Sequence, residues 1–507
     1  MARAPTAAAA AAALLLAGAC ALLFASPASA EAYEWTVYRN NLKAMTVPGL
    51  KGTVGDRLGE FLEYKFTLPI EFMRRSQSYV GPRTRLRRVV NDMLSGKKVE
   101  VAVLGGSISA GAVASRKMAA VDPNDVWNLV RIELQTHLSP KIDFFNNARS
   151  ATKSYITSIC LDRFLNATAD LVFVEFIAND GSEMDTQLQG PLDKTRSFER
   201  FLRKIQAQPS DPAVVMMQML VNEMAYPVGG RDGKPKRAFY STPEDTYGNL
   251  AQYYDIPAIS FRDALWQLGD NNRDGATWED FMGDDRLHPN DKGHQLMADM
   301  VVFLIQQTAL DLLMHPLTQA EISESRGPLP PPMFEGNEGS TDQTCAQGKN
   351  MTAYVKNSIG WAIIPFEDNA KYPTFGYETT TVGAPLVLEV DTTKSVNKSA
   401  GAGVVISYTK GKTGYGNMTI SCGNGCECEK ETIDGSVPYN QKVVFLAEVQ
   451  PTPAPACQIS IALDESSPAG SKIRISGIVV TGDPGVVEGR VGEEKYMAWL
   501  SGDAWAA

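Results

Sequence analysis

The fold class of this chain is decided by the stretch Val99-Glu-Val-Ala-Val-Leu-Gly-Gly-Ser-Ile-Ser109. A short apolar run that ends in two glycines is typical of a buried strand followed by a sharp turn. Similar apolar runs occur at 171–177 and 213–221, and a helical pattern covers 197–208 between them. Buried strands that alternate with helices predict a parallel sheet with helices on both faces. We therefore expect an α/β domain over residues 98–316, with its ligand site at the carboxyl ends of the strands.

Ser107 stands in the turn after the first of these strands. Gly105 and Gly106 allow an unusual backbone and the close approach of a substrate. The small residues that follow let a helix begin nearby, with N–H groups that can stabilise an anion. The same pattern also fits a glycine turn with a capping serine, so this turn alone does not establish a nucleophile.

A serine nucleophile needs a base, and the chain has only 4 histidines. His288 follows Asp285 by three residues, a spacing at which the carboxylate can orient the imidazole. A surface Asx turn is the alternative. His294 is a rival base, but its position fits the helix that begins after Asn290. The other two histidines are expected to be structural or exposed.

A polar corner closes the apolar run at 171–177. Asn179 lies in this corner and could donate an amide N–H to a developing oxyanion. The alternative is an Asx turn that merely ends the strand.

Together, Ser107, Asn179 and the segment Asp285-Arg-Leu-His-Pro289 resemble the SGNH hydrolase, or GDSL esterase/lipase, family over about residues 98–310. The resemblance implies an SGNH-like, flavodoxin-like α/β fold and a serine esterase. It assigns Ser107 as the nucleophile, His288 as the base and Asp285 as the residue that orients the histidine.

The sequence departs from the family pattern at several points. Gly106 replaces the usual aspartate of the first block, as in a eukaryotic secreted branch. In the second block, Ser150 or the next residue, Ala151, takes the place of the oxyanion glycine. The third block lacks its glycine but keeps Asn179. The resemblance implies an oxyanion hole built from the Ser107 N–H, the Ser150 or Ala151 N–H and the Asn179 side chain. The sequence has no Gly-rich phosphate loop and no convincing metal cluster, so we expect neither a metal nor a cofactor.

The first thirty residues are predicted to be a signal peptide. Arg3 precedes an apolar run at 7–25, and Ala28-Ser-Ala30 fits signal peptidase. An uncleaved anchor in the secretory pathway is the alternative, and no later segment is expected to be long and apolar enough to span a membrane. The net charge of −10 argues against nucleic acid and anionic membranes as partners.

Other segments flank the α/β domain. We expect an N-terminal helical extension at 31–97, a Pro-rich linker at 317–340, an all-β sandwich or jelly-roll module at 341–485 and a tail at 486–507. A basic run lies near the end of the extension and is expected to form a solvated helix face. It comprises Arg83, Arg85, Arg87 and Arg88.

Six cysteines follow residue 30, and five of them lie after residue 340. This usage predicts disulfides in an oxidising compartment, with the pairing left open. A zinc site is the alternative, although no histidine lies near these cysteines. Sequons at Asn166, Asn350, Asn397 and Asn417 predict N-glycosylation.

The sequence therefore predicts a secreted or cell-wall serine esterase. Its substrate is expected to be an acyl ester, such as an O-acetyl group on an extracellular glycan, or a lipid ester. Two alternatives stay open: a non-catalytic glycan-binding glycoprotein of the cell surface, and an acyltransferase that uses the same triad.

Overall fold

The structure is a computed structural model of the whole chain. It describes residues 40–41, 43–46, 51–112, 125–149, 152–180, 191–219, 242–271, 278–285, 287–338, 344–365, 375–393, 402–437 and 443–482. The predicted signal peptide at 1–30 and the tail at 486–507 lie outside these residues.

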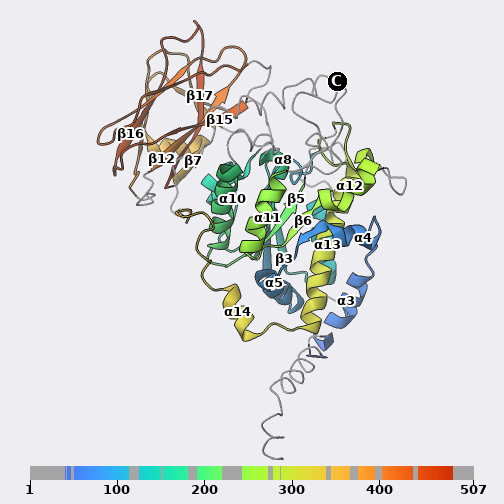
Figure 1. Cartoon of the computed structure of the whole chain (residues 1–507). Helices are drawn as coiled ribbons and strands as arrows, with labels where there is room; N and C mark the ends of the chain where they lie inside the picture. Colours follow the sequence, from blue (N-terminus) through green and yellow to red (C-terminus); the bar gives the residue numbers. More distant parts are fainter. Residues whose placement is uncertain are drawn as a thin grey trace, which may run out of the picture.

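A six-stranded sheet forms the centre of the α/β domain (Figure 1), in the order β1-β6-β5-β4-β2-β3. Its strands are β1 (Gln77–Tyr79), β2 (Val99–Gly105), β3 (Ile142–Asn146), β4 (Leu171–Glu175), β5 (Ala213–Gln218) and β6 (Ala258–Ser260). Strands β2 to β6 pair in parallel, which confirms the predicted sheet. β1 pairs antiparallel with β6, so the sheet is mixed rather than purely parallel as predicted. The added strand comes from the N-terminal extension.

Helices pack on both faces of this sheet, as predicted. They are α3 (Val54–Leu62), α4 (Ile70–Ser76), α5 (Thr84–Leu94), α6 (Val126–His137), α7 (Ser154–Ile159), α8 (Ile177–Asp180), α10 (Pro191–Gln206), α11 (Pro243–Tyr253), α12 (Phe261–Asn271), α13 (Asp291–Met314) and α14 (Gln319–Ser325), with short 3₁₀ turns η2 (Leu161–Arg163) and η5 (Trp278–Phe281). α13 packs against α5 and α6, whereas α10 packs against α7 and α11. Strands, helices and extension share one apolar core.

Strand order determines where a site can form. The chain passes from β2 outward to β3 and then returns past β2 to β4. Right-handed crossovers therefore place the helices after β3 and β4 on the face opposite to α6. Loops that leave β2, β3 and β4 meet at this reversal of direction, which is where open α/β sheets bind ligands.

Helix α13 corrects one expectation. Among the described residues it is the one helix that reaches the length and apolar composition of a membrane span, with a window mean hydropathy of 1.5. The expectation that no later segment is apolar enough was therefore wrong by those two criteria. In the structure, 78% of that window is buried inside the protein.

The basic run of the extension corrects a second expectation, that these arginines form a solvated helix face. Arg87 is only 5% exposed and Arg88 only 4%. The Arg87 guanidinium contacts the Asp311 carboxylate and lies 3.2 Å from Glu321, more than 220 residues further along the chain. Burial lowers the pKa of Arg88. Arg87 therefore joins α5 to α13 and α14, whereas Arg88 donates to the Asp211 carbonyl, and the run does not form a solvated face.

Two antiparallel sheets form the C-terminal module, in agreement with the predicted all-β module (Figure 1). One contains β15 (Val443–Val449), β12 (Gly403–Lys410), β17 (Ile473–Thr481), β10 (Phe375–Thr379) and β9 (Ala362–Pro365), with β7 (Thr344–Gln347) paired to β17; the other contains β14 (Glu431–Ile433), β13 (Met418–Gly423), β16 (Cys457–Leu463), β11 (Leu386–Val390) and β8 (Val355–Asn357). A 3₁₀ turn, η6 (Gly348–Tyr354), joins β7 to β8. Alternate side chains of both sheets build a core of their own.

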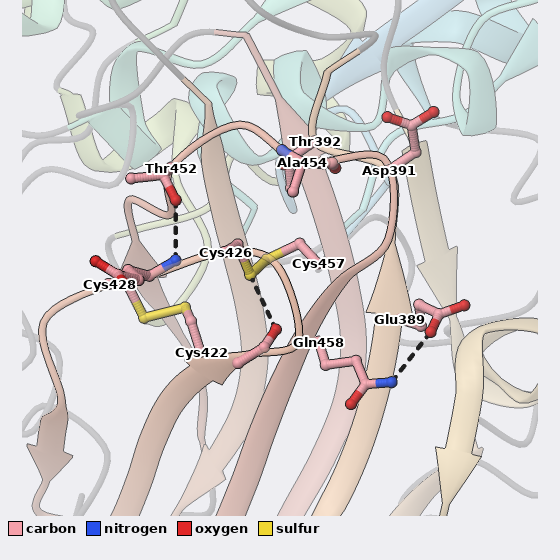
Figure 2. The surroundings of a disulfide bond; sticks show 12 residues. Glu389, Asp391, Thr392, Cys422, Cys426, Cys428, Thr452, Ala454, Cys457 and Gln458 are labelled. Atoms are coloured by element: carbon pink, nitrogen blue, oxygen red, sulfur yellow. Dashed lines mark hydrogen bonds between the residues drawn. A yellow bond between two sulfur atoms is a disulfide. The ribbon is translucent and has the colours of Figure 1, made fainter.

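All six of the later cysteines form disulfides, as predicted. Figure 2 shows two of them within the module, Cys422–Cys428 and Cys426–Cys457. Cys422, Cys426 and Cys457 have neighbouring sulfur atoms, the grouping that zinc would need, but each is bonded to another cysteine. The third disulfide, Cys160–Cys345, joins the two domains.

The segment between the domains lies against the α/β domain. Glu199 on α10 is fully buried and accepts hydrogen bonds from the Phe334 N–H, 3.3 Å, and the Asn337 amide, 2.5 Å. Arg203 donates to the Pro330 carbonyl at 2.7 Å. The predicted linker is thus fixed along α10 by a buried carboxylate and an arginine.

Candidate functional site

Ser107 lies at the carboxyl end of β2, in a tight helical turn. The Gly106 N–H donates to the Glu175 carbonyl, 3.2 Å, which continues the β2–β4 pairing up to the serine. The chain then coils at once, with the Ala110 N–H donating to the Gly106 carbonyl at 3.0 Å. The Ser107 side chain is half-buried, whereas Ile108 on its C-terminal side is buried. The turn therefore presents the hydroxyl at the edge of the sheet.

His288 lies in a loop that is fixed at both ends before α13. The Gly283 N–H donates to the His288 carbonyl at 2.7 Å. Asn290 donates from its side chain to the Met282 carbonyl, 2.9 Å, and accepts from the Gly293 N–H, 3.0 Å, as the N-cap of α13. One asparagine thus closes the loop and starts the helix.

The structure brings the three predicted triad residues together. His288 Nε2 lies 2.7 Å from Ser107 Oγ, and His288 Nδ1 lies 2.7 Å from Asp285 Oδ2. The other Asp285 oxygen accepts from the Leu287 N–H, 3.0 Å, and the His288 N–H, 2.9 Å. Both ring nitrogens are therefore engaged, one toward the carboxylate and the other toward the hydroxyl.

The ionised form of Asp285 is stabilised next to the His288 ring. Burial by itself raises the pKa of the Asp285 carboxyl, but the bonds from the His288 ring and from two backbone N–H groups outweigh it and lower the pKa below its ordinary value. The His288 ring is only 8% exposed. An ionised carboxylate in this position can stabilise the imidazolium that forms when the base takes a proton during the reaction.

Asn179 lies directly against the serine turn. A Cβ atom added to Gly106 would fall 1.8 Å from Asn179 Oδ1 and 3.1 Å from its Nδ2. The Asn179 side chain thus occupies the space that any side chain at position 106 would need. Glycine at position 106 leaves room for this placement of the asparagine.

Ser150 and Ala151, the predicted backbone donors of the second block, lie outside the described residues. The residues before them are fixed on the serine turn. The Arg149 N–H donates to the Gly105 carbonyl at 2.9 Å, and the Asn146 amide donates to the Ser109 carbonyl at 2.7 Å. The second block therefore approaches the same edge of the sheet as Ser107.

Asp180 is a site residue that the sequence reasoning missed. Its buried carboxylate accepts from the Ser154 N–H, 3.0 Å, the Ser154 hydroxyl, 2.7 Å, and the Tyr247 hydroxyl, 2.9 Å. It therefore joins α8, which also carries Asn179, to the start of α7. The signal was available, because the third block of the family reads Asn-Asp and only its asparagine was assigned a role.

Glu175 was missed as well. It is fully buried below the serine turn and accepts from the Ser109 N–H at 3.3 Å. Burial raises the pKa of the Glu175 carboxyl to about 8, so the group is largely neutral at pH 7. Nothing in the apolar run around it identifies a neutral acid.

The remaining histidines take no part in this cluster. His294 is buried within α13. His137 lies 3.4 Å from Glu133 on α6, and the side chain of His315 is 61% exposed after the end of α13. These positions agree with the structural or exposed roles expected for them.

Comparison with known proteins assigns the domain to a family. Residues 103–296 match the GDSL-like lipase/acylhydrolase family, which includes the serine turn, the Asn-Asp corner and the histidine loop. The chain therefore contains a domain similar to the GDSL-like lipase/acylhydrolases, which supports a hydrolase that acts on ester bonds. The match confirms the resemblance inferred from sequence; the eukaryotic branch stays a prediction. A comparison with curated protein sequences gave no match.

Solved structures share the fold. The crystal structure of a two-domain esterase described as active on acetylated mannans is similar at a TM-score of 0.57 and 16% identity, over 81% of this chain and 98% of that one. A structure of that esterase co-crystallized with mannopentaose gives a TM-score of 0.56 at 16% identity, over 82% and 98% of the two chains. At this identity the likeness extends to the fold alone.

Proposed function

We propose that this protein is a secreted serine esterase that removes acyl groups, O-acetyl groups first among them, from an extracellular glycan. The observation that carries the proposal is the continuous relay from Asp285 through His288 to Ser107, with 2.7 Å at each step. A half-buried serine at the carboxyl end of a parallel strand is accessible to a substrate, whereas the acid of the relay is stabilised as an anion.

The reaction follows from these contacts. Ser107 Oγ attacks the ester carbonyl while His288 Nε2 takes the hydroxyl proton, and Asp285 stabilises the imidazolium. The tetrahedral intermediate collapses as His288 gives the proton to the departing sugar hydroxyl, which leaves an acyl group on Ser107. Water, deprotonated by His288, then attacks the acyl-enzyme and releases the carboxylic acid.

The oxyanion is stabilised by donors around the serine turn. The contact of Asn179 with Gly106 supports the role of the Asn179 amide, and the Ser107 N–H lies in the same turn. The backbone N–H of Ser150 or Ala151 is the third proposed donor. Each donor of this kind contributes about 3 kcal/mol to lowering the barrier.

The substrate class rests on less direct support. The similar two-domain esterase is active on acetylated mannans, which makes an acetylated mannan the first substrate to test. Secretion is supported by three disulfides, which persist in oxidising compartments. The sequons at Asn166 and Asn350 are exposed, as an N-glycan requires, and Asn417 is half-buried. Asn397 lies outside the described residues.

The test compares the full chain with Ser107→Ala. Purified protein is expected to hydrolyse an aryl acetate and to release acetate from acetylated mannan, and Ser107→Ala is expected to lose both activities while keeping its circular dichroism spectrum. A fluorophosphonate probe, followed by peptide sequencing, is expected to modify Ser107 and not the neighbouring Ser109. Unchanged activity in Ser107→Ala would refute the proposal, and acetyl transfer to an added oligosaccharide in place of hydrolysis would redirect it to an acyltransferase.

A further inference from the structure

The second block of the site is joined to the β module by one short helix, α7. This helix has six residues and is therefore about 9 Å long. It begins directly after the segment that contains Ser150 and Ala151, and it ends at Cys160. A displacement at one end of so short a helix moves the other end as well.

The first turn of α7 is fixed to α8, the short helix that carries Asn179. The Ser154 N–H and hydroxyl donate to the two oxygens of Asp180, at 3.0 Å and 2.7 Å. Asp180 follows Asn179 directly, so one carboxylate fixes the second and third blocks relative to each other. The Tyr247 hydroxyl holds the same carboxylate from α11 at 2.9 Å.

The last turn of α7 is fixed to the β module. Cys160, the C-cap of α7, forms a disulfide with Cys345 on β7 over 185 residues of sequence. Arg163 donates to the Cys345 carbonyl at 3.0 Å. Covalent and polar contacts therefore meet at the same point of the module.

An apolar interdomain cluster surrounds this disulfide. It consists of Ile159, Cys160, Cys345, Val405 and Val479, with Tyr155, Phe164 and Leu446 packed against it. Cys345, Val479 and Val405 are direct neighbours on three adjacent strands, β7, β17 and β12. They form one row on the face of the sheet that meets α7.

The strands β12 and β17 are buried on this face as well as on the face of the module core. Val405 is fully buried and Val479 is 4% exposed, although the core of the module lies on the opposite face of their strands. That core takes the alternate residues, Val404 and Ile406 on β12 and Ile478 and Val480 on β17. A sheet buried on both faces in this way needs the α/β domain as its second layer.

We propose that the β module positions the oxyanion donor Asn179 through α7 and the Ser154–Asp180 contact, with Cys160 and Cys345 as the positioning residues. The inference rests on the proposed function, because it concerns the same oxyanion hole. The segment fixed along α10 by Glu199 also attaches the module, so the disulfide is not the sole connection between the domains. Its added effect is to fix the end of α7.

The test replaces this disulfide in the full chain. Cys160→Ser combined with Cys345→Ser is compared with Cys422→Ser combined with Cys428→Ser, which removes a disulfide of equal chemistry inside the module. The first variant is expected to lower kcat for an aryl acetate by about 10- to 100-fold with KM unchanged, because misplacing an oxyanion donor weakens transition-state binding. Affinity for an arylboronic acid, which mimics the tetrahedral adduct, should fall in parallel. The control variant should keep kcat.

A second measurement does not depend on activity. Hydrogen exchange of residues 152–159 is expected to rise in the Cys160/Cys345 variant and to stay unchanged in the control. Val479→Ala, which keeps every disulfide and the module core, should lower kcat by about 3-fold or more if the double variant fails to fold. Wild-type kcat together with wild-type exchange in these folded variants overturns the inference. Loss of esterase activity in the wild-type chain would instead refute the proposed function, and the exchange result would still decide the coupling.

Discussion

The contact between Gly106 and Asn179 gives the sharpest prediction. Gly106 is not in the left-handed region of φ, so the backbone accepts alanine there without strain. The added Cβ, however, would lie 1.8 Å from Asn179 Oδ1, whereas real Cβ atoms keep at least 3.0 Å. Asn179 must therefore retreat by about 1.2 Å, the difference of these two distances.

The size of the effect follows from this displacement. A shift of about 1 Å in a catalytic group can cost 10²-fold in rate, and loss of one oxyanion donor costs about 10²- to 10³-fold in kcat. We expect Gly106→Ala to lower kcat for an aryl acetate by about 10²-fold or more. Gly59→Ala is the matched control, because a Cβ at Gly59 on α3 meets nothing within 4 Å.

A double-mutant cycle separates the cause from general damage. Asn179→Ala removes the side chain that the new methyl group displaces, so Gly106→Ala should cost little more once Asn179→Ala is present. The assay measures kcat of the four proteins at one temperature, with circular dichroism to verify folding. Full activity in Gly106→Ala, or losses that simply multiply in the double variant, would refute the reasoning.

Three further predictions concern single side chains. Asp285→Asn should lower kcat by about 10⁴-fold, because an amide neither fixes the tautomer of His288 nor stabilises its imidazolium. A fluorophosphonate that modifies Ser107 should react correspondingly slowly with this variant. Labelling at a near-normal rate would count against the relay. Burial raises the pKa of Glu175 to about 8, so the folded wild type retains a proton that the unfolded chain releases above about pH 4.5. The free energy of unfolding of Glu175→Gln, relative to that of wild type, should therefore rise by about 1.4 kcal/mol for each pH unit between pH 4.5 and 8. If urea unfolding gives the two proteins parallel pH curves, the carboxyl is ionised in the folded protein. Arg87→Ala should destabilise the domain by about 3 kcal/mol, because Asp311 and Glu321 lose their buried partner. The kcat of the folded variant should be unchanged. An unaltered melting temperature would contradict the predicted loss of stability.

The sequence predicted the strands and contacts that are determined by residues close together in the chain. The run at 99–104 is apolar because β2 is buried on both faces, and the runs that became β4 and β5 follow the same rule. The spacing of Asp285 and His288 was also sufficient to predict their contact, because a carboxylate three residues before a histidine reaches its ring within one loop. In these cases the neighbour in sequence is the neighbour in space.

The expectations that failed depend on partners far along the chain. Arg87 looked like part of a solvated face because its acidic partners, Asp311 and Glu321, follow by more than 220 residues. β1 is three residues long and gains its strand pairing only from β6. Glu175 gives no sign of burial in sequence, since a carboxyl at the end of an apolar run is as often solvated as buried.

The departure at Gly106 shows how the two kinds of information combine. In sequence, Gly106 is a departure from the first block of the family pattern, and Asn179 is a match to the third. In the structure the first and third blocks share one volume: the side chain of Asn179 fills the space that a residue with a Cβ at position 106 would take. The placement of Asn179 seen in this chain therefore depends on glycine at position 106. A side chain at position 106 of this chain would force Asn179 to move, and the double-mutant cycle therefore tests whether the present position of Asn179 matters for the reaction.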